Sequence, residues 1–185
     1  MSRLSPLDYE SLDENQKRHF DNVVGMRGLG DDDRLGGPFD AMVLAGGLGR
    51  NLGRVGMAIR TDTVVDRRFV ELAILVAGQF WKAQFEWWAH EPMALDAGVP
   101  AEVVASIKAG EEPAFADARD AACYRLCRAL HVDHQVDDEI YAAAVTHFDE
   151  VGVVELIATS GYYTLISMLL NSHQIPVPEG EPPPF

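Results

Sequence analysis

Three ionisable side chains, Glu71, Glu86 and His90, stand at spacings that could bring them together. Glu86 and His90 are four residues apart, so on a helix their side chains lie one above the other. Glu71 interrupts an earlier apolar run, and a hairpin of two helices can place it against the other two. Apolar surroundings disfavour the charged form of a carboxylate, whereas a nearby carboxylate favours the cationic form of histidine. The three residues are therefore predicted to exchange protons as catalytic acid–base groups.

Two other interpretations of these residues stay open. Glu86 and His90 could form an ion pair on a half-exposed helix while Glu71 faces water. Two carboxylates and one histidine are also an attested set of metal ligands. No further ligand spacing supports a metal site, so none is predicted.

Arginine is concentrated near these groups in the sequence. Residues 50–68 hold five arginines and two aspartates, a local charge of +3 in a chain whose net charge is −14. Arginine binds carboxylates through two parallel hydrogen bonds. Arg50, Arg54 and Arg60 are therefore predicted to hold an anionic substrate, although scattered surface ion pairs would give the same pattern. Trp81 and Trp87 are predicted to line the same site and exclude water.

The elements that must position these residues are predicted to be helices. Apolar residues recur at helical spacing between glycine and proline positions, and few stretches alternate as strands do, so the fold class is all-α. Helices over residues 63–77 and 79–97, separated by Gly78, form a predicted helical hairpin at the core. Pro92 is expected to kink the second of them beside His90.

The remaining segments complete a helical domain. Residues 46–56 have the glycine spacing of a nucleotide-binding loop, but no strand precedes them, so a turn between helices is predicted. A loop is expected over residues 28–38, and the proline-rich end cannot be helical. The predicted organisation is an N-terminal helix and loop over residues 1–39, a helical domain over 40–175 and a tail over 176–185. Further helices are expected over residues 13–25, 40–48, 100–109, 114–131, 137–148 and 149–171.

Composition limits the partners and the location. The chain has 185 residues, 48% hydrophobic and 24% charged, which fits one globular domain. With 29 acidic against 15 basic residues, it should repel nucleic acids and anionic membrane surfaces. No uncharged apolar run reaches the roughly 18 residues that span a bilayer. The absence of a secretory pattern at the start, together with only two cysteines, leads us to expect a cytoplasmic protein.

Eleven residues separate Glu71 from Ala83, two separate Ala83 from Glu86, and three separate Glu86 from His90. This spacing resembles that of the carboxymuconolactone decarboxylase and alkylhydroperoxidase D superfamily. The ending Ala94-Leu-Asp-Ala-Gly-Val-Pro100 and the segments 161–171 and 175–180 add to a likeness that covers about residues 40–180. In the peroxidase branch, cysteines stand where this chain has Ala83 and Glu86. Without a thiolate there, no peroxide can be attacked, and the sequence is more similar to the decarboxylase branch.

The resemblance implies an all-helical bundle of the alkylhydroperoxidase D type that assembles as a homotrimer or homohexamer. It also implies a cofactor-free lyase that acts on a small carboxylated lactone. His90 would be the general acid, Glu86 would orient it, and Glu71 would be a second proton-handling or positioning carboxylate. Two alternatives stay open: a hydroperoxide reductase that uses Cys123 and Cys127, and a non-catalytic oligomeric binder of small molecules.

Overall fold

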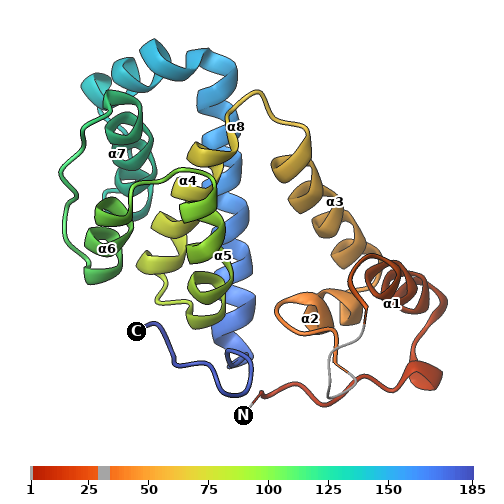
Figure 1. The fold of residues 1–185 in the computed structure, drawn as a ribbon. Coiled ribbons are helices and arrows are strands. Elements are labelled where there is room, and N and C mark those ends of the chain that lie inside the picture. Colours follow the sequence, from red (N-terminus) through yellow and green to blue (C-terminus); the bar gives the residue numbers. More distant parts are fainter. Residues whose placement is uncertain (1, 29–33) are drawn as a thin grey trace.

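The computed structural model describes residues 2–28 and 34–185, and throughout these residues the regular elements are helices (Figure 1). The all-α prediction is confirmed. The loop predicted over residues 28–38 lies partly outside the described residues. The elements are η1 (Tyr9–Ser11), α1 (Glu14–Arg27), α2 (Phe39–Leu44), α3 (Gly47–Thr61), α4 (Arg67–Phe80), α5 (Gln84–Asp96), α6 (Ala101–Ala109), α7 (Ala118–Val132) and α8 (Asp138–Ser172).

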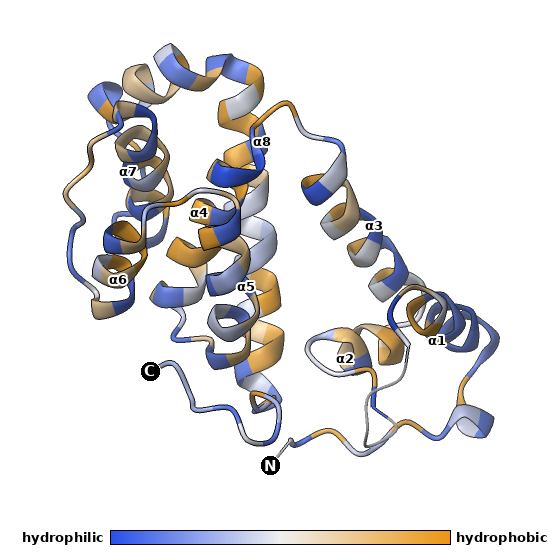
Figure 2. Cartoon of the chain, viewed as in Figure 1, coloured by the Kyte–Doolittle hydropathy of each residue, from blue (hydrophilic) through white to orange (hydrophobic). Residues whose placement is uncertain are grey.

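Helix α4 is the centre of the bundle. It contacts α3, α5, α6, α7 and α8, and residues 69–78 are buried without interruption. A helix that is apolar on every side must be covered on every side. Figure 2 shows hydrophobic residues along α4 and along the part of α8 beside it. Glu71, the one acidic residue in this stretch, is therefore held in the core.

The turn of the helical hairpin lies later than predicted. Helix α4 continues through Gly78 to Phe80, and α5 begins at Gln84. Gly78 is a packing position, because a Cβ built there would lie 3.7 Å from Cγ of Glu86. The chain reverses at Lys82, whose φ of 48° is in the left-handed region. Helix α5 passes through Pro92 to Asp96.

The glycine-rich segment is a helix and not the predicted turn. Residues 47–56 belong to α3. A Cβ at Gly49 would lie 1.7 Å from the carbonyl oxygen of Met42, and one at Gly56 would lie 2.3 Å from Oη of Tyr162. The glycines therefore allow α2 and α8 to approach α3 closely, which explains their spacing without a nucleotide.

The two helices predicted over residues 137–148 and 149–171 form one element, α8. Asp149 has non-helical φ and ψ of 54° and −176°, so the chain bends where the boundary was predicted. By length and composition α8 could cross a membrane. In this structure it packs against α3, α4, α5 and α7 and buries residues from Ala144 to Leu170, as the core helix of a bundle does.

Helices α1, α2 and α3 contact one another and stand opposite α5 and α8 (Figure 1). Helix α1 begins with a capping box in which Asp13 and Gln16 bond each other's backbone N–H groups. The C-terminal segment runs back to α5, where Gln84 exchanges two hydrogen bonds with the backbone of Phe185. The Phe185 ring packs edge-on against Trp87, with 5.2 Å between ring centroids.

Candidate active site

The structure brings Glu71, Glu86 and His90 together. Nδ1 of His90 lies 2.7 Å from Oε2 of Glu71, and Arg67 forms an ion pair with the other oxygen of that carboxylate. A carboxylate paired with arginine accepts hydrogen bonds only, so Nδ1 of His90 donates. Nε2 of His90 lies 3.1 Å from Oε1 of Glu86, although that oxygen has no hydrogen-bonded partner. Nε2 is therefore the ring nitrogen that remains available to a ligand.

All three side chains are buried, with 0%, 3% and 9% exposed for Glu71, Glu86 and His90. Burial raises the pKa of Glu86; the His90 charge opposes this and the Glu71 charge adds to it. Burial alone would lower the pKa of His90, but the Glu86 and Glu71 carboxylates outweigh it, and the net shift is upward. Histidine here is a cation over a wider pH range than in water, and Glu86 is a carboxylate that protonates readily.

A cavity of about 920 Å³ opens beside these groups. Glu86, His90 and Trp88 of α5, with Tyr162 and Tyr163 of α8, line one side. Residues of α1, α2 and α3 line the other, which matches the two groups of helices in Figure 1. Glu71 is behind His90 and is not part of the lining. A ligand in this cavity can thus touch His90 and Glu86 but not Glu71.

The predicted anion-binding arginines share one face of α3. Arg50, Arg54 and Arg60 all line the cavity, and at 3.6 residues per turn they lie within about one third of the helix circumference. The other two arginines of the basic segment are engaged elsewhere. Arg67 pairs with Glu71, and Arg68 pairs with Asp120.

The predicted role of Trp81 and Trp87 finds no support in this geometry, because neither residue lines the cavity. Trp81 is the C-cap of α4, and Trp87 is fully buried against the C-terminal segment. Phe85 and Trp88 take the cavity side instead.

Tyr163 contributes to the site, although no pattern in the sequence assigns it a role. Its ring meets His90 edge-on with 5.1 Å between centroids, and its hydroxyl accepts a hydrogen bond from Arg60 at 3.4 Å. Burial, with the nearby Glu86 charge, raises the pKa of Tyr163, so it stays a neutral hydroxyl. It links the arginine face of α3 to the acid–base groups of α5.

Helix α1 supplies a second histidine that sequence reasoning also missed. His19 lines the cavity, is 4% exposed and has no hydrogen-bonded partner on Nδ1. Burial lowers its pKa, a backbone hydrogen bond at Gly46 opposes this, and the Arg50 charge lowers it further. The sequence held no signal for this role, because contact between α1 and the cavity depends on tertiary packing alone.

The two cysteines are free thiols buried in the core. Cys123 donates to the backbone oxygen of Phe69 at 3.5 Å, and neither sulfur lines the cavity. Burial, with Cys127 beside it, raises the pKa of Cys123 well above that of a free thiol. Such a thiol forms little thiolate, which disfavours Cys123 as a peroxide-attacking group.

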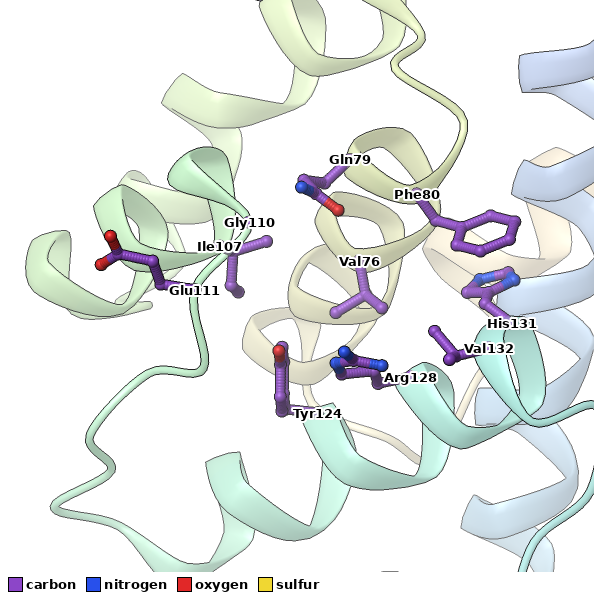
Figure 3. Close-up of a pocket in the computed structure, with 10 residues that line it drawn as sticks. All are labelled: Val76, Gln79, Phe80, Ile107, Gly110, Glu111, Tyr124, Arg128, His131 and Val132. Carbon is purple, nitrogen blue, oxygen red and sulfur yellow. The ribbon is translucent and has the colours of Figure 1, made fainter.

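A smaller pocket of about 90 Å³ lies between α4, α6 and α7 (Figure 3). There, the His131 ring stacks on Phe80, and its Nε2 lies 3.1 Å from Oγ of Ser160. The stacking and the hydrogen bond satisfy the His131 side chain within the core, so its position needs no functional explanation. Across the described ranges, no group of three or more histidine, cysteine or acidic side chains is arranged to hold a metal ion.

No protein-family model matches the chain, and neither does any curated protein. Among solved structures, the chain is similar to the alkylhydroperoxidase AhpD core of an uncharacterized peroxidase-related protein from Ralstonia eutropha JMP134. The TM-score is 0.76 with 13% sequence identity, over 96% of this chain and 93% of that one. The match is too long to be confined to residues 40–180, so the N-terminal region shares in the likeness. The chain therefore has an alkylhydroperoxidase D-like helical fold.

Proposed function

We propose that the protein is a cofactor-free acid–base enzyme that decarboxylates a carboxylated lactone or a related carbonyl compound. The observation that carries the proposal is the placement of His90 between two buried carboxylates, with its Nε2 side beside a large cavity. Such a group can deliver a proton to a bound carbon acid without a metal or an organic cofactor.

The reaction needs two things from the chain, namely stabilisation of a negative charge and delivery of a proton. The bond between the substrate carbon and its carboxylate breaks, carbon dioxide leaves, and the electron pair moves into the unsaturated carbonyl to form an enolate. Arg60 and the neutral Tyr163 hydroxyl are placed to stabilise that negative charge. Nε2 of His90 then gives its proton to carbon, the carbonyl reforms, and His90 regains a proton from solvent by way of Glu86.

The contacts favour Glu71, and not Glu86 as first predicted, as the carboxylate that orients His90. Glu71 makes the hydrogen bond that orients His90, and Arg67 holds Glu71 in turn. Glu86 lines the cavity and has the raised pKa. In the proposed mechanism Glu71 is thus the positioning carboxylate and Glu86 returns protons to Nε2.

Peroxide reduction, suggested by the name of the structural neighbour, is the alternative. The positions of the motif cysteines are occupied by Ala83 and Glu86, and Cys123 is buried with a raised pKa. A thiol cycle would therefore lack an accessible nucleophile. We also propose that the protein is cytoplasmic, because free cysteines are typical of proteins in that reducing compartment.

Wild-type protein should be assayed side by side on a panel of carboxylated lactones and on an alkyl hydroperoxide with a thiol donor. We expect decarboxylation, and we expect His90→Ala to lower kcat by about 10² to 10⁴. His147→Ala, at an exposed position of α8, is the matched control and should keep full activity. Peroxide loss that disappears when Cys123 and Cys127 become serine would replace the proposal. No turnover on any substrate would favour a non-catalytic binder.

A further inference from the structure

The cavity is larger than a small lactone requires. At about 920 Å³, it lies near the upper end of the roughly 300–1,000 Å³ typical of sites for drug-sized ligands. Its size therefore points to a ligand with a body that extends well beyond the reacting group.

Much of the cavity wall is apolar and flexible. Four of the six methionines in the chain line it: Met26, Met42, Met57 and Met93. Three of them, Met26, Met57 and Met93, are 61%, 40% and 45% exposed. Uncovered apolar side chains on facing helices indicate a surface that a ligand covers, and methionine adapts to irregular apolar shapes.

The polar part of the wall is cationic. Arg27, Arg50, Arg54 and Arg60 line the cavity, and among the residues that the structure describes Glu86 is the one acidic residue in the lining. None of these arginines forms an ion pair with a carboxylate in the part of the chain that the structure describes. In a chain with 29 acidic residues, arginines without such partners on one wall favour an anionic ligand.

The cations occupy two ends of the cavity. Arg60 bonds Tyr163 beside His90. Arg50 is ten residues earlier on α3, about 15 Å away at the rise of an α-helix. At that far end His19 is nine-tenths buried, with an unpartnered Nδ1 and the Arg50 charge close enough to lower its pKa. An acidic group held there and a reacting group at His90 belong to an elongated molecule.

We propose that the cavity binds an amphipathic organic acid, with a carboxylate that takes no part in the reaction at Arg50 and His19 and its apolar body along the methionine-lined wall. This inference rests on the proposed function only in placing the reacting end of the substrate at His90. Binding is measured without turnover, so the two proposals can fail separately.

Isothermal titration calorimetry on the full-length protein provides the test. We expect dodecanoate to bind at least about 100-fold more tightly than butanoate, because the longer chain buries more apolar surface. Dodecanoate should also bind at least about tenfold more tightly than dodecanol, which lacks the charge. These comparisons use wild-type protein and need no variant to fold.

Variants then locate the carboxylate. Arg50→Gln should weaken dodecanoate binding by about tenfold or more. The matched control Arg125→Gln, at an exposed position outside the cavity, should leave binding unchanged.

Equal affinity for dodecanoate and butanoate would overturn the inference, and so would equal affinity for the acid and the alcohol. An Arg50→Gln variant that binds as wild type would overturn the assignment of the carboxylate site. Absence of any dodecanoate binding, as expected if a second copy of the chain fills the cavity, would overturn the whole inference.

Discussion

His90 is a buried histidine whose two ring nitrogens have different surroundings. On one side Arg67 and Glu71 fix Nδ1 through an ion pair and a hydrogen bond. On the other, Nε2 lies near Glu86 beside the cavity. The hydrogen bond at Nδ1 fixes the orientation of the ring, so His90 is positioned to transfer a proton from Nε2 to a ligand in the cavity.

The raised pKa of His90 should make the protein less stable as pH rises. Between the ordinary histidine pKa of 6.5 and the higher folded value, the folded state holds a proton that the unfolded state has released. The free energy of unfolding should therefore fall as pH increases through this window. The lowered pKa values of His19 and His131 act below 6.5 and in the opposite direction.

Urea unfolding at a series of pH values from 6.5 upward measures this slope. His90→Gln should flatten it, whereas His147→Gln at an exposed position should not. A wild-type stability that rises with pH over the same range would contradict the prediction.

The acid–base residues of the site could be predicted from the sequence, but the residues that surround them could not. Glu86 and His90 follow from helical spacing, and Glu71 follows from its place in an apolar run. The positions of Trp81 and Trp87 could not be predicted, because Trp81 lies outside α5 at the C-cap of α4 and only tertiary packing shows that Trp87 contacts the C-terminal segment. Tyr163 and His19 come from distant segments, so only tertiary packing shows that they reach the site.

At the element scale, α3 combines close packing with a cationic face. Gly49 and Gly56 face α2 and α8, while Arg50, Arg54 and Arg60 face the cavity. The glycines let the helix approach its neighbours closely, and this approach brings Arg60 within reach of Tyr163. Substitution of a glycine should therefore harm stability and site geometry together.

Gly49→Ala should destabilise the protein by about 3 kcal/mol or more, because overpacking against backbone cannot relax easily. The added Cβ would stand 1.7 Å from the Met42 carbonyl oxygen. Gly47→Ala is the matched control, since nothing lies within 4 Å of a Cβ there. Urea midpoints of the two variants measure the difference. Equal stability of both variants would show that α2 and α3 do not pack in this way.

The presence of most helices could be predicted from the spacing of apolar residues, but several of their first and last residues could not. Gly78 and the glycines of residues 46–56 were interpreted as breaks, because isolated glycine weakens a helix. Gly49, Gly56 and Gly78 instead admit a neighbouring helix or side chain, and the sequence alone does not show that neighbour. The break at Asp149 was predicted correctly, within what is otherwise one long helix.

At the scale of the whole molecule, an apolar surface remains uncovered on α8. Val151, Val154, Ile157 and Met168 are between 40% and 65% exposed. The chain carries a net charge of −14, so copies should repel one another except where an uncharged face meets an uncharged face. This face of α8 is a suitable contact between subunits.

We predict that the protein is a homotrimer or homohexamer that uses this α8 face. Size-exclusion chromatography with light scattering should give three or six times the 20.3 kDa chain mass. Val154→Asp should shift the mass towards the monomer, because it buries a charge in an apolar contact. Ala142→Asp, exposed on the earlier part of α8, should not. A wild-type monomer at micromolar concentration would contradict the prediction.

His90 is held as a proton donor between Glu71 and Glu86, and nuclear magnetic resonance titration of its imidazole measures this property. We expect a His90 midpoint above the ordinary histidine pKa of 6.5, because the two carboxylates favour the cation, and a lower midpoint in Glu86→Gln. A His90 midpoint at or below 6.5 that does not change in Glu86→Gln would show that these carboxylates do not hold the proton on His90.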